Sequence, residues 1–396
     1  MNISIGVFFG GRSVEHEVSI LSAQQAIAAL DRSKYDVVPV YIGKDGRWFT
    51  GPDLMDVANF KDLAGLRGRS TAVIPSLIPG EGTLLPHPAG LFSRKPVARL
   101  DAALIVMHGT TGEDGCLQGL LELMDVPYTG CDVAASALGM DKVAAKRVWK
   151  TLGLPVVDFV EIETRAWFTD PAPLVARVER ELGYPVVVKP SNLGSSVGLN
   201  TARDAAALRA AVEDTAQYTQ RILVERMIEP LREINCSVLG DIDEARPSVC
   251  EEPVKSKDIL SFQDKYGGGG AKGGGGSAGM SGLKRLLPAP IPDELAARVR
   301  AHAVTAFQGL RCAGVARIDF LYHEPSGSVY ANEINTIPGS LSFYLWDATG
   351  LNFPALLDRL IDLAFKRQRD LKKLRFSFDT NLLAGASGAK SGSKRS

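Results

Sequence analysis

The stretch VARIDFLYHEPSGSVYANEINT, residues 315–336, carries the clearest structural pattern in this chain. Two runs of β-branched and aromatic residues flank EPSGS, residues 324–328, which is rich in turn-forming residues. The pattern predicts a β-hairpin with EPSGS as its loop. Because side chains alternate between the two faces of a strand, this hairpin brings four polar side chains to one face in two cross-strand pairs, Asp319 with Glu333 and Arg317 with Asn335.

Two interpretations of this polar face are open. Directly paired residues lie about 5 Å apart at Cβ, so Asp319 and Glu333 are close enough to share a cation. Carboxylate and amide oxygens, without histidine or cysteine, suit Mg²⁺ that is held together with phosphates. The same residues also fit a solvated strand face with an Arg–Asp ion pair. The hairpin by itself does not separate the two.

Composition narrows the class of protein. The 396 residues are enough for two or three domains. Lysine plus arginine and aspartate plus glutamate both number 45, so no net charge favours nucleic acid or a membrane as partner. The five cysteines are scattered without metal-ligand spacing and predict a reduced, cytoplasmic protein. The apolar run at the N-terminus is too short for a signal peptide or a membrane span.

Strand and helix patterns alternate in the N-terminal part. The apolar runs at residues 3–9, 35–42 and 100–109 predict strands of an open, parallel, doubly wound sheet. Residues 53–96 are rich in proline and glycine and predict a surface excursion. We therefore expect an α/β domain over residues 1–140.

The pattern changes after a helix that begins near Asp141. The strands YPVVVKP, RILVERMI and INCSVLG follow more closely on one another, which predicts an α+β lobe over residues 141–235. Residues 236–375 form a further lobe with a helix near residues 292–309, the hairpin and C-terminal helices. The small, polar and basic residues 376–396 predict a disordered tail.

Two stretches are candidate nucleotide contacts. In KPSNLGSSVGLN, a strand ends in Lys189 and a Gly/Ser loop follows, which offers a cation and backbone N–H groups to phosphate. It is not a P-loop, and a plain hairpin turn is the alternative. In ERMIEPLREINCSV, Glu225 and Glu233 flank an apolar pair that fits an adenine edge and a ribose. Surface glutamates are the alternative there.

The N-terminal glycine turn GGRSVEHEVS lacks the spacing of a dinucleotide site. Ser13, with His16 and Glu17, is expected to cap the following helix. His108 follows the carboxyl end of a strand, where open α/β sheets bind ligands, although a lone histidine is often structural. No G-x-S-x-G motif supports a serine hydrolase.

Taken together and in this order, the motifs resemble the D-alanine–D-alanine ligases, which are peptide ligases with the ATP-grasp fold. The matching stretches are GGRSVEHEVS, HGTTGEDGCLQGLLELMDVPYTG, MDKVAAKRVW, YPVVVKPSNLGSSVG, the glutamates of ERMIEPLRE, RIDF and NEINTIPG. They reach from residue 3 to about residue 370. The resemblance implies a three-domain α/β fold and ATP-dependent ligation of two D-alanines through an acyl phosphate, for peptidoglycan precursors. A ligase that takes D-serine or D-lactate as second substrate is the alternative.

The resemblance also implies a role for each matched residue. The ATP contacts are expected to be Lys142, Lys189, Ser196, Glu225, Ile228, Glu233 and Lys265. Two Mg²⁺ or Mn²⁺ ions are expected at Asp319, Glu333 and Asn335. The first D-alanine is expected at Glu15, which receives its ammonium, with Val18 and His108 alongside. The oxyanion is expected at Arg317 and the Gly339 N–H, and the set closing the site at Glu15, Ser195 and Tyr266.

One motif departs from the family. After NEINTIPG the family commonly continues with Met-Thr or Phe-Thr and then a serine that binds the second substrate's carboxylate, whereas SLSFYLW, residues 340–346, stands here. Either Ser342 or Tyr344 is expected to supply the hydroxyl, and the motif does not say which.

The glycine-rich stretch KYGGGGAKGGGGSAGMSG, residues 265–282, has the composition of a flexible linker. The resemblance instead implies a lid over residues 261–284, with Tyr266 as specificity residue. Depsipeptide-forming relatives commonly have a histidine there, so D-alanine is the expected second substrate. Because family members are usually dimeric, the resemblance also implies a homodimer.

Overall fold

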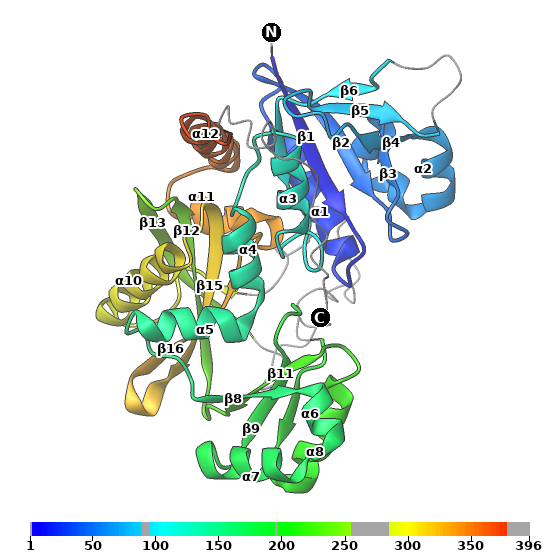
Figure 1. Cartoon of the computed structure of the whole chain (residues 1–396). Helices are drawn as coiled ribbons and strands as arrows, with labels where there is room; N and C mark the ends of the chain where they lie inside the picture. Colours follow the sequence, from blue (N-terminus) through cyan, green and yellow to red (C-terminus); the bar gives the residue numbers. More distant parts are fainter. Residues whose placement is uncertain (1, 89–94, 195–196, 255–284, 378–396) are drawn as a thin grey trace, which may run out of the picture.

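The computed structural model describes residues 2–88, 95–194, 197–254 and 285–377. It contains three sheets, each with a hydrophobic core of its own. In Figure 1 the N-terminal sheet lies at the upper right in blue and cyan, a five-stranded sheet lies at the left, and a four-stranded sheet lies at the bottom in green. These are the mixed α/β architecture and the N-terminal parallel strands that the sequence predicts.

The N-terminal sheet has seven strands in the order β6-β5-β4-β3-β2-β1-β7. Strand β1 (Ile3–Gly10) pairs in parallel with β2 (Tyr35–Ile42) and with β7 (Ala102–Ile105). Helix α1 (His16–Ala29) connects β1 to β2. The turn before it needs glycine, because Gly10 has a φ of 90° and a Cβ there would lie 2.3 Å from the Ile42 carbonyl oxygen.

The expectation of a surface excursion over residues 53–96 is wrong for the described part of this range, residues 53–88 and 95–96. An antiparallel meander continues the sheet with β3 (Trp48–Thr50), β4 (Thr71–Pro75), β5 (Thr83–Pro86) and β6 (Ala98–Arg99). Three short helices lie between β3 and β4: η1 (Pro52–Met55), η2 (Val57–Lys61) and α2 (Leu63–Arg69). Its apolar side chains contribute to the core of the sheet, since Leu54, Leu66 and Leu84 are fully buried. Proline is tolerated at strand ends, so Pro75 and Pro86 end strands without excluding them.

The five-stranded sheet has the order β14-β13-β12-β15-β16 and is antiparallel. Its strands are β12 (Arg232–Gly240), β13 (Ala245–Pro253), β14 (Arg285–Leu286), β15 (Gly314–His323) and β16 (Ser328–Asn335). Helices α4 (Val133–Met140), α5 (Lys142–Thr151) and α10 (Asp293–Gly309) share one core with this sheet. The domain boundary expected after residue 235 falls inside β12, and α5 packs with the five-stranded sheet.

The four-stranded sheet has the order β10-β9-β11-β8. It consists of β8 (Phe159–Glu163), β9 (Val186–Pro190), β10 (Asn200–Ala202) and β11 (Arg221–Arg226), with helices α6 (Thr164–Thr169), α7 (Ala172–Glu181) and α8 (Ala205–Thr215). Val188 and Val224 belong to the core of this lobe. Because side chains alternate, their neighbours Lys189 and Glu225 point to the opposite face of the sheet.

Five helical elements of the described ranges remain, and one of them, α12, connects two of the units. Helix α3 (Cys116–Leu123) follows β7, and the C-terminal elements are η4 (Glu324–Ser326), η5 (Gly339–Ser342), α11 (Phe343–Asp347) and α12 (Phe353–Leu371). Leu356 and Leu360 of α12 share a core with the N-terminal sheet and with Val315 of β15. This helix therefore holds the N-terminal unit against the five-stranded sheet. Within the described ranges, no helix is long and apolar enough to cross a bilayer.

Candidate active site

The β15–β16 hairpin forms the predicted pairs. Asp319 lies opposite Glu333, and Arg317 lies opposite Asn335. The prediction of a five-residue loop is wrong, because His323 already pairs with Ser328. The shorter turn ends at Gly327, which has a φ of 66°.

A β-bulge explains why the predicted pairs form although the predicted loop is one residue too long. Phe320 pairs with Ala331, so the ladder shifts by one residue between Asp319 and Phe320, and Asn332 is the extra residue. The bulge thereby restores the register that the longer loop would have set. Asn332 Oδ1 accepts a 3.0 Å hydrogen bond from Lys189 Nζ, which comes from the other lobe.

Of the four side chains on the polar face, Arg317 and Asp319 are buried, and Glu333 and Asn335 are partly exposed. Arg317 donates two hydrogen bonds to Asp319, of 2.7 and 2.8 Å, and Asn335 Nδ2 donates a third of 3.1 Å. Burial opposes the charge on Arg317, but the ion pair with Asp319 overrides it and raises the pKa of the guanidinium. The Arg–Asp pair of the alternative interpretation exists, but both of its side chains are buried.

The donor chemistry at this face fits a hard divalent cation. Asp319, Glu333 and Asn335 offer only oxygen ligands from side chains, and each carboxylate has a cation beside it. Glu333 Oε2 lies 3.6 Å from Lys142 Nζ, as Asp319 lies against Arg317. Residues 2–88, 95–194, 197–254 and 285–377 contain no cluster of three or more His, Cys, Asp or Glu that could hold a metal by itself.

A buried cluster of two lysines and one glutamate joins the two lobes. Glu225 Oε2 lies 2.5 Å from Lys189 Nζ, and Glu225 Oε1 lies 2.7 Å from Lys146 Nζ. Lys146 is fully buried and also donates to the Ala331 carbonyl at 3.3 Å. Burial lowers the pKa of Lys146 to about 8, whereas the two lysines outweigh burial and lower the pKa of Glu225.

Sequence reasoning missed Lys146. The available signal was its spacing, because Lys146 lies four residues after Lys142 and three before Trp149, on the buried side of α5. A lysine in a core-facing position needs a buried anion as partner.

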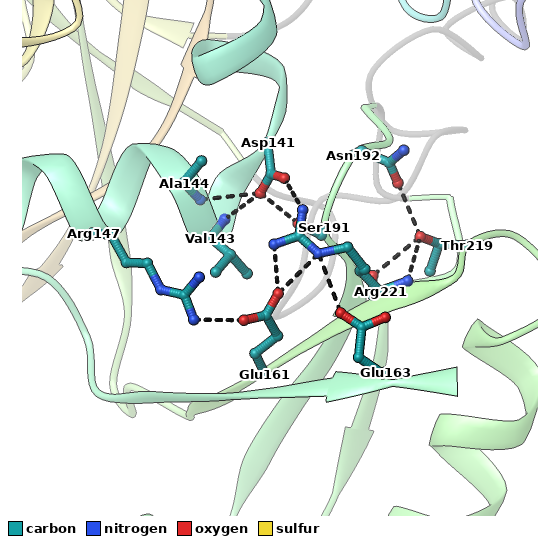
Figure 2. A network of polar contacts seen from close by, with 10 residues as sticks. All are labelled: Asp141, Val143, Ala144, Arg147, Glu161, Glu163, Ser191, Asn192, Thr219 and Arg221. Atoms are coloured by element: carbon teal, nitrogen blue, oxygen red, sulfur yellow. Dashed lines mark hydrogen bonds and ion pairs between the residues drawn. The ribbon is translucent and has the colours of Figure 1, made fainter. Parts of the chain in front are cut away.

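A second polar network fixes the start of α5 (Figure 2). Asp141 caps this helix by accepting from the backbone N–H groups of Val143 and Ala144, both at 3.0 Å, and it also accepts from Ser191 Oγ at 2.7 Å. Arg221 forms ion pairs with Asp141 and with Glu161. The network connects the helix to the strands of the smaller lobe.

Lys142 is the first residue of that helix. Its backbone N–H donates to the Ser191 carbonyl at 2.8 Å, and its Nζ donates to the Leu193 carbonyl at 2.6 Å. The side chain of Lys142 is therefore held against the Gly/Ser loop that follows Lys189. Both predicted phosphate lysines thus border the same space as Glu333.

The N-terminal unit contributes Glu15, Val18 and His108, all buried. A Cβ built on Gly194 would lie 3.0 Å from Glu15 Oε2, so the Gly/Ser loop passes directly over this carboxylate. The predicted helix cap is wrong, because α1 begins at His16 without a side-chain cap. Ser13 Oγ accepts instead from the backbone N–H of Glu15, at 3.0 Å, since the turn ends one residue before the helix.

His108 holds the loop that contains Gly339. Its Nδ1 lies 2.8 Å from the Ile337 carbonyl and must donate to it, while its Nε2 lies 2.9 Å from Ser22 Oγ. Ser22 Oγ in turn accepts from the Ser340 backbone N–H at 3.0 Å. Burial lowers the pKa of His108 to about 4, so the ring is neutral at pH 7.

Glu113 is a further site residue that sequence reasoning missed. Its carboxylate accepts from the backbone N–H of Gly109 at 2.8 Å and from that of Ile337 at 3.0 Å. Burial and the nearby charge of Glu15 raise the pKa of Glu113 to about 8. The signal was its place in TGEDG directly after His108, at the carboxyl end of a parallel strand.

Of the two candidate hydroxyls after Gly339, only that of Tyr344 reaches the polar face. It donates to Glu251 Oε1 at 3.1 Å. Ser342 is fully buried with a φ of 50°, and its hydroxyl has no hydrogen-bond partner among the described residues. Gly339 itself begins η5.

Two further predicted residues lie on or directly after strands, and four lie outside the described ranges. Ile228 follows β11, and Glu233 lies near the start of β12, opposite Leu321. Their predicted adenine and ribose contacts remain predictions. The predicted residues that lie outside the described ranges are Ser195, Ser196, Lys265 and Tyr266, together with the lid at 261–284 and most of the tail.

Comparisons with known proteins agree with this geometry. Residues 4–131 match the family described as D-ala D-ala ligase N-terminus, and residues 148–362 match D-ala D-ala ligase C-terminus. The chain is 39% identical over 384 residues to a D-alanine–D-alanine ligase of Thermosipho melanesiensis, covering 96% of this chain and 98% of the relative. It is 38% identical to that of Acetivibrio thermocellus, covering 92% and 96%.

Solved structures give the same result. The D-alanine–D-alanine ligase of Coxiella burnetii superposes with a TM-score of 0.77 at 31% identity, covering 94% of this chain and 98% of that one. The VanG D-Ala:D-Ser ligase of Enterococcus faecalis superposes with a TM-score of 0.76 at 32% identity, covering 92% and 100%. Both the sequence and the fold match over nearly the whole chain, and the chain therefore belongs to the D-alanine–D-alanine ligase family.

Proposed function

We propose that the residues gathered between the two lobes and the N-terminal unit carry out the family's reaction, the ATP-dependent ligation of two D-alanines to D-alanyl-D-alanine. The observation that carries this proposal is the convergence of two lysines, two carboxylates and one buried arginine on one space. Lys142 and Lys189 border it from one side, and Arg317, Asp319 and Glu333 border it from the five-stranded sheet. Phosphoryl transfer needs this concentration of charge more than it needs a covalent nucleophile.

In the first step the γ-phosphoryl group of ATP passes to a carboxylate oxygen of the first D-alanine, which releases ADP and forms an acyl phosphate. Lys142 and Lys189 neutralise the phosphates and align them. Asp319, Glu333 and Asn335 would hold Mg²⁺ or Mn²⁺, which when bound neutralises further phosphate charge. Glu225, Ile228, Glu233, Ser196 and Lys265 are the proposed contacts to the rest of ATP.

In the second step the amine of the second D-alanine attacks the carbonyl carbon of the acyl phosphate. The tetrahedral oxyanion is stabilised by Arg317 and the Gly339 N–H, and the collapse of this intermediate expels phosphate. The bonds from His108 and Glu113 to Ile337 support a fixed position for Gly339, two residues further on. A preformed oxyanion site does not have to reorganise during the reaction.

The first D-alanine binds by its ammonium to Glu15, with Val18 and His108 beside it. Burial of this carboxylate favours an ion pair with the substrate over contact with water. Ser195 and Tyr266 complete the hydrogen-bonded set that closes the site. We further propose that the enzyme supplies peptidoglycan precursors in the cytoplasm and works as a homodimer, as is usual in the family.

D-Serine or D-lactate as second substrate is the alternative. The match to VanG, a D-Ala:D-Ser ligase, supports testing it. The test is to incubate the protein with ATP, Mg²⁺, D-alanine and equal amounts of D-serine and D-lactate. Mass spectrometry then identifies the product. We expect D-alanyl-D-alanine to dominate. A dominant mixed product would contradict the choice of second substrate, and the absence of ADP formation would contradict the proposed reaction.

A further inference from the structure

The polar face extends beyond the predicted residues. Four side chains stand at the same level across four strands, because Glu251 pairs with Asn235, Asn235 pairs with Asp319, and Asp319 pairs with Glu333. Glu251 on β13 is 3% exposed and belongs to no motif of the family resemblance. A buried carboxylate in line with the reaction centre needs an explanation of its own.

Glu251 has three polar partners. Its Oε1 accepts from Asn235 Nδ2 at 3.2 Å and from the Tyr344 hydroxyl at 3.1 Å. Its Oε2 accepts from a terminal nitrogen of Arg285 at 3.3 Å. The guanidinium of Arg285 also lies over the ring of Tyr344, 3.7 Å from the centroid. Three segments far apart in the chain therefore meet in one compact cluster, which we call the β13 cluster: Glu251, Arg285 and Tyr344.

The β13 cluster lies on the far side of the centre from the phosphate groups. Along the row, Glu333 with its neighbour Lys142 stands at one end and Glu251 stands at the other. Asn235, which donates to Glu251, pairs across the strands with Asp319, the partner of Arg317, so the cluster adjoins the row that holds the oxyanion arginine. Arg317 thus stands between a phosphate side and a side that carries a second, partly buried arginine, Arg285.

The reaction needs both sides. Phosphate leaves the tetrahedral carbon on the side of the lysines, so the incoming amine must enter from a side that phosphate does not occupy. The amine belongs to an amino acid whose carboxylate also has to be neutralised. Arg317 is already engaged by Asp319. Arg285, which pairs with Glu251, is a further cation of the described residues on the entry side, and it lies outside the motifs that were assigned from the sequence.

We propose that the β13 cluster is the acceptor subsite, in which Arg285 receives the α-carboxylate of the second amino acid and Glu251 positions both Arg285 and the Tyr344 hydroxyl. This inference rests on the proposed function. A guanidinium offers a planar fork that matches a carboxylate, and stacking on Tyr344 fixes the plane of that fork. Tyr344 then serves where the family commonly uses a serine.

Hydroxylamine separates binding of the acceptor from the other steps. It attacks the acyl phosphate through nitrogen, forms a hydroxamate, loses a proton and expels phosphate, and it carries no carboxylate. In Arg285→Met we expect the KM for the acceptor D-alanine to rise about tenfold or more, the typical effect of losing a charged hydrogen bond. The rate of D-alanyl hydroxamate formation should stay within about twofold of wild type.

Arg246→Met is the matched control. Arg246 also lies on β13 and stacks on an aromatic ring, with its guanidinium 5.5 Å from the Trp346 centroid, but it is exposed. It should change neither reaction. An equal loss with both acceptors in Arg285→Met, or no loss with either, would overturn the role of Arg285. Failure of the wild-type enzyme to form hydroxamate would instead count against the acyl-phosphate mechanism.

Glu251→Gln and Tyr344→Phe test the positioning part. Glu251→Gln keeps the shape but removes the anion beside Arg285, so we expect the acceptor KM to rise while the KM for ATP and the hydroxylamine rate stay at wild-type values. Tyr344→Phe keeps the stacked ring and removes the hydroxyl, and it should give a smaller rise in the same constant. If either variant raises the KM for ATP as much as the KM for the acceptor, the substituted side chain supports the fold in general, and the proposal fails.

Discussion

Lys189, at the end of β9, donates a 3.0 Å hydrogen bond to Asn332, the extra residue of the bulge in β16. The bulge therefore has two consequences. It sets Asp319 opposite Glu333, and it turns the Asn332 side chain toward Lys189, the proposed phosphate lysine of the other lobe. Together with the bond from Lys146 to the Ala331 carbonyl, this contact links the smaller lobe and α5 to the strand that carries Glu333.

Glu333→Gln should abolish turnover and leave the fold intact. The substitution keeps the shape of the side chain but removes one of the two carboxylates of the proposed metal site, whose other member is Asp319. Steady-state rates in ordinary Mg²⁺ and circular dichroism measure the two effects. Glu324→Gln, on the exposed hairpin turn, is the matched control and should keep wild-type activity. Turnover of the Glu333 variant at the wild-type rate would show that the metal assignment is wrong.

Lys146→Met should destabilise the protein and weaken ATP binding. It leaves Glu225 in a buried position with Lys189 as its other partner, and breaking a buried ion pair from one side costs about 3–5 kcal/mol. Urea unfolding gives the free energy of unfolding, and initial rates give the KM values. We expect the KM for ATP to rise more than that for D-alanine.

Lys150→Met on the exposed side of the same helix controls for helix propensity and should change the free energy of unfolding by less than about 0.5 kcal/mol. Wild-type stability of the Lys146 variant would mean that the cluster contributes little to the joining of the lobes.

Glu15→Gln should raise the KM for the first D-alanine far more than that for ATP. A neutral amide cannot pair with the substrate ammonium, and losing a charge-assisted bond changes binding by about tenfold or more. The two substrate constants are separated by varying D-alanine over a wide range at saturating ATP. Unchanged D-alanine kinetics would remove Glu15 from the first subsite.

His108→Gln should make stability less dependent on pH in the acid range. The folded pKa of His108 is about 4 against 6.5 in the unfolded chain, so the unfolded chain binds the extra proton first. The stability contributed by neutral His108 is therefore present above pH 6.5 and is lost as the pH falls toward 4. The loss amounts to about 3 kcal/mol.

The measurement is urea unfolding of wild type and variant at several values between pH 7 and pH 4.5. His323→Gln provides the control, because His323 lies at the exposed end of the hairpin. Parallel stability curves for wild type and His108→Gln would contradict the buried neutral ring.

The order of the motifs was enough to predict the family and the reaction, and it supplied the proposed site residues, because each motif is a short segment whose chemistry is local. Alternation along a strand likewise predicted which side chains of the hairpin face each other. Such patterns depend only on the geometry of neighbouring residues. They do not show how a proline-rich segment such as 53–96 packs, because its apolar residues find their partners in distant strands.

The tertiary structure decided what depends on contacts between distant segments. The hairpin loop is one residue shorter than the sequence predicted, and the bulge at Asn332 compensates for the difference. A bulge depends on the pairing of both strands, which neither strand shows by itself. Lys146 became a partner of Glu225 only when α5 met β11, and Glu251 joined the reaction centre through two successive cross-strand registers. Arg285 reached Tyr344 from a segment 59 positions earlier in the chain. Burial and strand register exist only in the folded chain. The contacts that these charged side chains make could therefore be identified only from the tertiary structure.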